Sequence, residues 1–166
     1  GVGSYSAWTP STGTTHYTLV DETSCNGTTD YVSTSLIGGR DSFAVSVASV
    51  PNGSVITGIS IIPCASKDVN SGTANLSVFY RLNGTDSANS ATYALSGKTP
   101  VTLATTTYSG LFVTKNASTT LETGVVRVSG TAGARVSRLA TIITYSSIPN
   151  TPTNVRNTVS SSTNVL

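Results

Sequence analysis

Seven carboxylates could supply acid–base or metal chemistry in this 166-residue chain, and four of them fall in its first quarter: Asp21, Glu22, Asp30 and Asp41. Calcium takes oxygen ligands, and acidic loops often supply them. The spacing of these four acids matches no Asp-x-Asp-x-Asp loop. The sequence therefore leaves calcium binding open beside the alternative that the acids cap turns or face solvent. It predicts no other cofactor.

The residues that nucleophilic catalysis requires are scarce. His16 is the only histidine, so any Ser/His/Asp triad would depend on it, and no Gly-x-Ser-x-Gly turn surrounds a serine. Paired acids for glycoside cleavage could come from different strands. Hydrolases of that kind usually present aromatic platforms to the sugar, whereas this chain has one Trp and seven Tyr. We therefore expect no catalytic residue, and we expect His16 to be a surface or half-buried strand residue.

Two cysteines, Cys25 and Cys64, are the other reactive side chains. A zinc site would lack ligands, because only one histidine is present. Two cysteines in an exported β-protein are more often bridged than free. The sequence predicts a Cys25–Cys64 disulfide, with two buried free thiols as the alternative.

Asn-linked glycans are a further chemical possibility, since several Asn residues begin an Asn-x-Ser/Thr sequence. Turn-forming Asn and Gly in a chain rich in Ser and Thr produce the same pattern by chance. The candidate acceptors are Asn26, Asn52, Asn75, Asn83 and Asn116.

The elements that must position these residues are strands. About a third of the chain is Ser or Thr, and these residues alternate with Val, Ile, Leu, Phe and Tyr in short runs. Such alternation predicts strands with one apolar and one hydroxyl-bearing face, and Gly and Asn mark the turns between them. The expected strands span residues 16–21, 31–35, 41–46, 55–63, 74–82, 92–95, 101–107, 111–114, 121–129 and 135–145.

This pattern predicts an all-β fold, an antiparallel β-sandwich of the jelly-roll kind with extended N- and C-terminal segments. An immunoglobulin-like sandwich is the alternative, but it would place a Trp between the cysteines, and Trp8 precedes both. We divide the chain into an N-terminal arm or edge strand (1–15), the sandwich (16–147) and a Pro/Ser/Thr segment (148–166). The last segment is a linker, an arm or the start of another module.

Polar ends of this kind could pair with the sheet edge of a neighbouring copy. Trp8 and Tyr5 are then the expected assembly anchors, because large amphipathic rings give much contact area.

Three segments resemble a β-sandwich module of large bacterial surface proteins: Val20 to Val32, Arg40 to Phe43, and Ile59 to Cys64. A looser form of the same pattern resembles modules of phage virion proteins. Residues 148–166 resemble the opening of a fibronectin type III module. The resemblance implies a surface β-sandwich, and no catalytic residue is carried over from it.

Charge and composition narrow the function. Charged residues make up only 10% of the chain, and the net charge of +2 comes from scattered single residues, which argues against nucleic acid as a partner. The chain begins at Gly1 and contains no Met, which favours export or a cell-surface location. The sequence thus predicts a non-enzymatic structural subunit of an extracellular filament, pilus-like fibre or sheath, whose partners are copies of itself. The alternatives are a phage tail or decoration protein, and a carbohydrate-binding or adhesive surface module that binds glycans.

Overall fold

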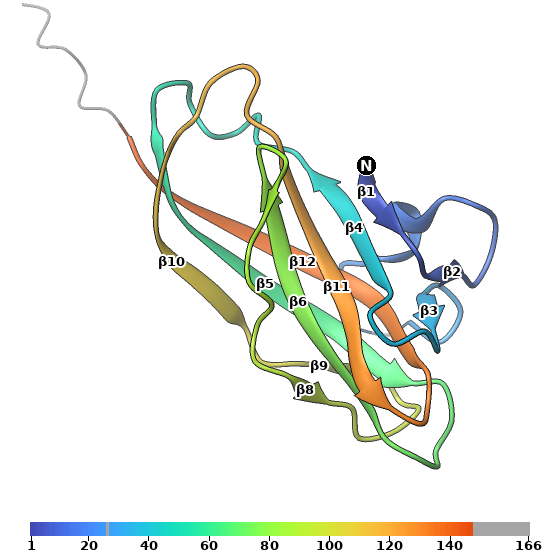
Figure 1. Ribbon diagram of the computed structural model, residues 1–166. Helices are drawn as coiled ribbons and strands as arrows, with labels where there is room; N and C mark the ends of the chain where they lie inside the picture. Colours follow the sequence, from blue (N-terminus) through green and yellow to red (C-terminus); the bar gives the residue numbers. More distant parts are fainter. Residues whose placement is uncertain (26, 148–166) are drawn as a thin grey trace, which may run out of the picture.

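A computed structural model describes residues 1–25 and 27–147, which form two sheets that face each other (Figure 1). Every strand pairing in both sheets is antiparallel. The prediction of an all-β, antiparallel sandwich is therefore confirmed. Asn26 and the segment 148–166 lie outside the described residues, so the expected linker, arm or following module is not part of this description.

The first sheet has the strand order β1-β4-β11-β6-β7, and β8 also pairs with β6. Its strands are β1 (Val2–Ser6), β4 (Arg40–Val45), β6 (Ala74–Leu82), β7 (Thr85–Asp86), β8 (Tyr93–Ala94) and β11 (Leu121–Gly130). The second sheet has the order β10-β5-β12-β3-β2, and β9 also pairs with β5. Its strands are β2 (Thr9–Pro10), β3 (Val32–Thr34), β5 (Val55–Lys67), β9 (Val101–Thr102), β10 (Thr106–Thr114) and β12 (Ala134–Ser146).

Alternation along the strands explains the core. Leu121, Thr123 and Val125 of β11 point inward, and they pair with Val45, Phe43 and Asp41 of β4 in the antiparallel register. From the second sheet, Ile56, Ile59 and Ile61 of β5 fill the same interior and are fully buried. Burial of apolar side chains between two sheets is the main source of stability in such a fold.

One predicted strand is wrong. Residues 16–21 do not extend, because His16–Leu19 form the 3-10 helix η1 instead. Leu19 and Val20 are adjacent in sequence and both buried, which a strand with one apolar face cannot achieve. The helical turn places both in the core and leaves His16 and Tyr17 beside β4.

The N-terminal segment belongs to its own sandwich. β1 pairs with β4 and β2 pairs with β3 of the same chain. Trp8, between these strands, is 2% exposed, and its indole N–H donates to the Gly39 carbonyl at 3.0 Å. The expectation of Trp8 as an anchor on a neighbouring copy is corrected, because the ring is enclosed by its own chain.

Tyr5 likewise binds within its own chain. Its ring meets Phe79 edge-on with 5.8 Å between the ring centroids, and its hydroxyl donates to Asp86 at 2.7 Å. Phe79 points outward from the first sheet yet is fully buried, and Arg40 also covers it. Gly124 makes this possible, since a Cβ there would lie 2.5 Å from the Phe79 ring. The expectation of Tyr5 as an assembly anchor is corrected for the same reason.

The burial of Trp8 gives a first test of the fold. Because Trp8 is the only tryptophan, the fluorescence of the native chain reports its surroundings alone. We expect blue-shifted emission and weak acrylamide quenching in dilute solution, with both lost on unfolding. Emission that is red-shifted and freely quenched in the dilute native protein would contradict a Trp8 buried within one chain.

The two cysteines form the predicted disulfide, with their Cα atoms 5.5 Å apart. The bridge ties the loop before β3 to the buried part of β5, and the Ser137 hydroxyl donates to the Cys64 Sγ at 3.2 Å. No helix within residues 1–25 and 27–147 is long and apolar enough to cross a membrane.

The candidate glycan acceptors that the structure describes lie in several settings. Asn75 is half-buried and donates to Ser129, whereas Asn52, Asn83 and Asn116 are exposed. The side-chain oxygens of Asn83 and Asn116 accept backbone N–H groups in tight turns, so turn formation alone accounts for both residues. Glycosylation stays a prediction.

Candidate functional site

Two adjoining hollows open beside η1, where β1 and β4 of one sheet approach β12 of the other. The first, of about 310 Å³, lies between β1, residues 14–17 and β4; the second, of about 450 Å³, lies between β4 and β12. Tyr17 and Phe43 line both. We call the two together the seam cleft.

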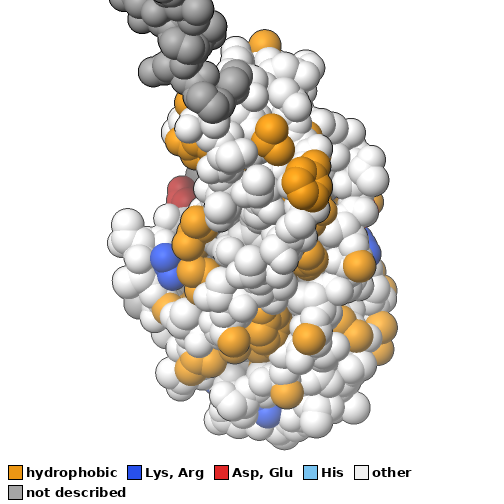
Figure 2. Space-filling view, turned by 90° about the vertical axis from the view of Figure 1, so that its left-hand side faces the viewer, with side chains coloured by type: hydrophobic (Ala, Val, Ile, Leu, Met, Phe, Trp, Pro, Cys, Tyr) orange, Lys and Arg blue, Asp and Glu red, His pale blue; other side chains and the backbone are white. Residues whose placement is uncertain are grey.

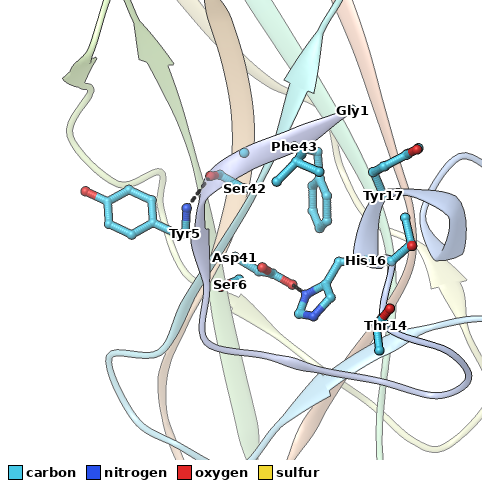
Figure 3. Close-up of a pocket in the computed structure, with 12 residues that line it drawn as sticks. Gly1, Tyr5, Ser6, Thr14, His16, Tyr17, Asp41, Ser42 and Phe43 are labelled. Atoms are coloured by element: carbon cyan, nitrogen blue, oxygen red, sulfur yellow. Dashed lines mark hydrogen bonds and ion pairs between the residues drawn. The ribbon is translucent and has the colours of Figure 1, made fainter.

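The first hollow contains a carboxylate–imidazole pair. Nδ1 of His16 lies 2.8 Å from Oδ2 of Asp41, and Figure 3 shows the two side chains facing each other across the hollow. The Asp41 side chain is fully buried, and its other oxygen, Oδ1, has no hydrogen-bond partner among the described residues. In the same view the Tyr5 ring lies on the other side of β1 from His16.

The surroundings of Asp41 disfavour its charged form. Burial raises the pKa of its carboxyl from 3.8 to about 6, while the hydrogen bond and charge of His16 and the Ser42 amide act in the opposite direction. The folded-state pKa is thus higher than the unfolded one. This group favours the folded state fully at pH values below about 4, and that contribution is lost as the pH rises through about 6.

This shift predicts a pH-dependent effect of Asp41→Asn. Between pH 4 and 7, the free energy of unfolding of the native chain should fall by up to about 3 kcal/mol relative to that of the variant. This is the free energy that corresponds to the difference between the folded and unfolded pKa values of Asp41. Denaturant titrations of both proteins at pH 4, 5, 6 and 7 measure the difference. A constant difference across this range would show that Asp41 does not titrate as its burial requires.

The second hollow is lined by hydroxyls and aliphatic groups. Thr123 of β11 and Thr141 of β12 come from opposite sheets, and their hydroxyls lie 2.9 Å apart. Val45 and Leu139 are half-buried beside them. This part of the seam cleft therefore offers both hydrogen-bonding hydroxyls and apolar contact area.

A third surface lies away from the seam cleft. Figure 2 shows the side that carries β10, where most of the surface is hydroxyl, amide or backbone, with separate hydrophobic groups and few charges. On β10, Phe112 is 85% exposed, and the Thr107 hydroxyl lies 2.9 Å from that of Ser60 on β5. A carbohydrate-binding module is expected to show an exposed row of Tyr or Trp on a sheet face. Of the described residues of these two types, only Tyr145 is largely exposed.

The sequence-derived site residues are dispersed. Asp41 binds His16 in the first hollow and Asp21 lines the second hollow, whereas Glu22 and Asp30 line neither. No group of three His, Cys, Asp or Glu side chains that could hold a metal ion exists in the described part of the chain. The structure therefore does not gather these four acids into one such group, and calcium binding by them stays a prediction.

The seam cleft presents groups that can bind a ligand. Asp41 is the one carboxylate that lines the first hollow, and Asp21 lines the second. Among the described residues no hydroxyl is hydrogen-bonded to Nε2 of His16, as an activated nucleophile would be. What the hollow offers is a buried acceptor oxygen beside aromatic rings.

Comparison with known proteins gives a likeness at the level of the fold. No family model and no curated protein matches the chain. One similar solved structure is the CBM36-1 domain of a multidomain xylanase from the hindgut metagenome of Trinervitermes trinervoides, with a TM-score of 0.42 and 13% identity over 70% of this chain and 79% of that chain. Another is a carbohydrate-binding module, CBM36, in complex with calcium and xylotriose, with a TM-score of 0.36 and 21% identity over 69% of this chain and 79% of that one. At these scores the likeness says nothing of what this chain binds.

The interpretation of the chain as a filament subunit is wrong. The N-terminal strand, which exchange with a neighbour would require to be free, is paired with β4 of its own sheet. The homopolymer partner and the anchoring roles of Trp8 and Tyr5 are withdrawn with this interpretation.

Sequence reasoning missed the other residues of the seam cleft. A usable signal was present in β4, where Asp41, Phe43 and Val45 share the inward face. A carboxylate at an apolar position of an alternating strand must be paired or face a cavity. Thr123 gives the same signal between Leu121 and Val125. Tyr17 carries no comparable signal. Its position depends on η1, and the residue pattern of 16–21 predicts a strand there instead.

Proposed function

We propose that this chain is a non-enzymatic carbohydrate-binding module of an extracellular or cell-surface protein. The observation that supports it best is the seam cleft, in which a buried acceptor oxygen, hydroxyls and aromatic rings line two adjoining hollows. Sugars present hydroxyls at their edges and apolar C–H groups on their faces. A cleft with both polar and aromatic lining is complementary to both.

The chemistry of the whole chain supports a location outside the cytosol. The Cys25–Cys64 disulfide requires an oxidising compartment to persist. Charged residues are few, and hydroxyl and amide side chains hydrate much of the surface instead. The boundaries of the module at residues 16 and 147, and a linker over 148–166, remain predictions.

A glycan array probed with the fluorescently labelled chain tests this function. We expect binding to a restricted set of glycans, and at least tenfold weaker binding by Tyr17→Ala, because Tyr17 lines both hollows. Isothermal titration with the best array glycan measures that loss.

Tyr145→Ala is the matched control, since Tyr145 is exposed at the end of β12 and lines neither hollow. Circular dichroism of both variants checks that they fold. An array without a single bound glycan would exclude the function. Equal loss of affinity in Tyr17→Ala and Tyr145→Ala would place binding elsewhere than the seam cleft.

A further inference from the structure

The free oxygen of Asp41 is the unexplained feature of the seam cleft. Its side chain is fully buried, and Oδ1 has no hydrogen-bond partner among the described residues. A buried acceptor without a donor is costly, and a charged one more so. Such a group therefore indicates a donor that arrives with a ligand.

Three of the neighbouring side chains that could donate to it are engaged elsewhere. His16 binds the other oxygen, Oδ2. The Ser42 hydroxyl donates to Glu122 at 2.6 Å, and the Tyr5 hydroxyl donates to Asp86 at 2.7 Å. Ser6 pairs with Asp41 in the register of β1 and β4 and lines the same hollow, but no donor of the described residues lies within hydrogen-bond distance of Oδ1. A donor carried by a ligand would complete Asp41.

We infer that the first hollow binds one terminal residue of a neutral glycan chain, with a sugar hydroxyl donating to Oδ1 of Asp41. This inference rests on the proposed function. It adds that the ligand is the end of a glycan chain, that the sugar is neutral, and that Oδ1 of Asp41 is the protein atom that accepts its hydroxyl. A hydroxyl bound to a carboxylate makes a charge-assisted hydrogen bond, which is stronger than a neutral one.

The size and shape of the two hollows favour a chain end. A volume of about 310 Å³ lies at the lower limit of small-molecule sites, which span roughly 300–1,000 Å³. It suits one sugar ring better than a run of them. The first hollow is more enclosed than the second. The two hollows share Tyr17 and Phe43, so the second hollow continues the first toward the more open side. A second sugar residue would lie there, with the rest of the chain leading outward.

The charges around the hollows favour a neutral sugar. Asp41 contributes a carboxylate to the first hollow and Asp21 one to the second, and no Lys or Arg side chain lines either hollow. The nearest such group on β4, Arg40, covers Phe79 and pairs with Asp86 on the outer face of the sheet. The carboxylate of a uronic acid would therefore lie beside these acids, where His16 already pairs with Asp41 and no Lys or Arg side chain compensates the added charge.

The test uses the full chain and two probe sets. The first set contains the neutral sugars D-glucose, D-galactose, D-mannose, D-xylose and L-fucose, and the second contains D-glucuronic and D-galacturonic acid. Each is titrated at pH 7.5 into ¹³C-labelled protein while the Asp41 carboxyl carbon signal is followed by NMR. We expect at least one neutral sugar to shift this signal saturably and to displace the best array glycan, and the two acids to do neither.

Asp41→Asn should weaken binding of the best array glycan at least tenfold. Asp68→Asn is the matched control, because Asp68 follows β5 and lines neither hollow, and it should leave binding unchanged. If the array glycan binds but uronic acids compete equally, or the Asp41 carbon signal is unmoved by any sugar, the inference is overturned while the proposed function stands. If no glycan binds to the native chain, the proposed function itself fails.

Discussion

Removal of the disulfide by Cys25→Ser and Cys64→Ala together should lower the free energy of unfolding by about 4 kcal/mol. The bridge joins residues 39 positions apart, and closing a loop of that length removes about this much chain entropy from the unfolded state. For a chain of this size, such a loss corresponds to a fall in Tm of roughly 8–16 °C. Guanidinium titration of the oxidised and doubly substituted proteins measures it directly.

Native protein treated with a reductant is the control, because it keeps both thiols and loses only the bond. It should unfold near the midpoint of the double variant. The substituted protein should be slightly less stable than the reduced native protein, because it loses the hydrogen bond from the Ser137 hydroxyl to the Cys64 Sγ. Identical midpoints for the oxidised and reduced native protein would show that the bridge does not restrict the unfolded chain.

Arg127→Met should destabilise the sandwich by about 3–5 kcal/mol. Arg127 is 2% exposed and donates to the carbonyls of Ser35, Gly130 and Ala132, at 2.7 Å for the shortest contact to each. Methionine fills much of the same volume but donates nothing. Three enclosed carbonyls would then lose their donors, at about 1–3 kcal/mol each.

Two further variants isolate the hydrogen bonds from the charge. Arg127→Lys keeps the charge but cannot reach three carbonyls with one ammonium group, so we expect an intermediate loss. Lys98→Met removes an exposed cation and should change stability by less than about 0.5 kcal/mol. A full rescue of the unfolding midpoint by Arg127→Lys would show that charge, and not the guanidinium geometry, is what the site requires.

Most of the sandwich could be predicted because alternation is a local signal. The range 74–82 was predicted with the bounds that β6 has, since an apolar or aromatic residue occupies every second position from Ala74 to Leu82. The strands β1, β2 and β7 could not be found in this way. They are short or polar, and their pairing with β4, β3 and β6 depends on contacts that are distant in sequence.

The candidate site was only partly predictable. His16 and Asp41 were both singled out, but nothing in the spacing of residues 16 and 41 indicates that their side chains meet. Their pairing requires η1 to turn back onto β4, and Leu19 and Val20 fix that turn by burying neighbouring side chains. The second hollow is harder still, because Thr123 and Thr141 meet only when the two sheets are stacked.

The assignment of Trp8 shows how composition can mislead. A tryptophan among Gly, Ser and Thr suggests an exposed anchor when only its neighbours in sequence are considered. In the fold those polar neighbours form β1 and β2, and the indole ring fills the space between them and Gly39. The polar surroundings of Trp8 are therefore the outer surface of a segment whose one large side chain points inward.

Backbone amide NMR of the ¹⁵N-labelled chain, titrated with the best array glycan, tests the central claim that the seam cleft is where sugar binds. The account predicts saturable shifts at Asp41, Phe43 and Tyr17 and at Thr123 and Thr141, with Phe112 and Ser60 unmoved. Shifts confined to the β10 face around Phe112, or the absence of any shift at saturating glycan, would contradict it.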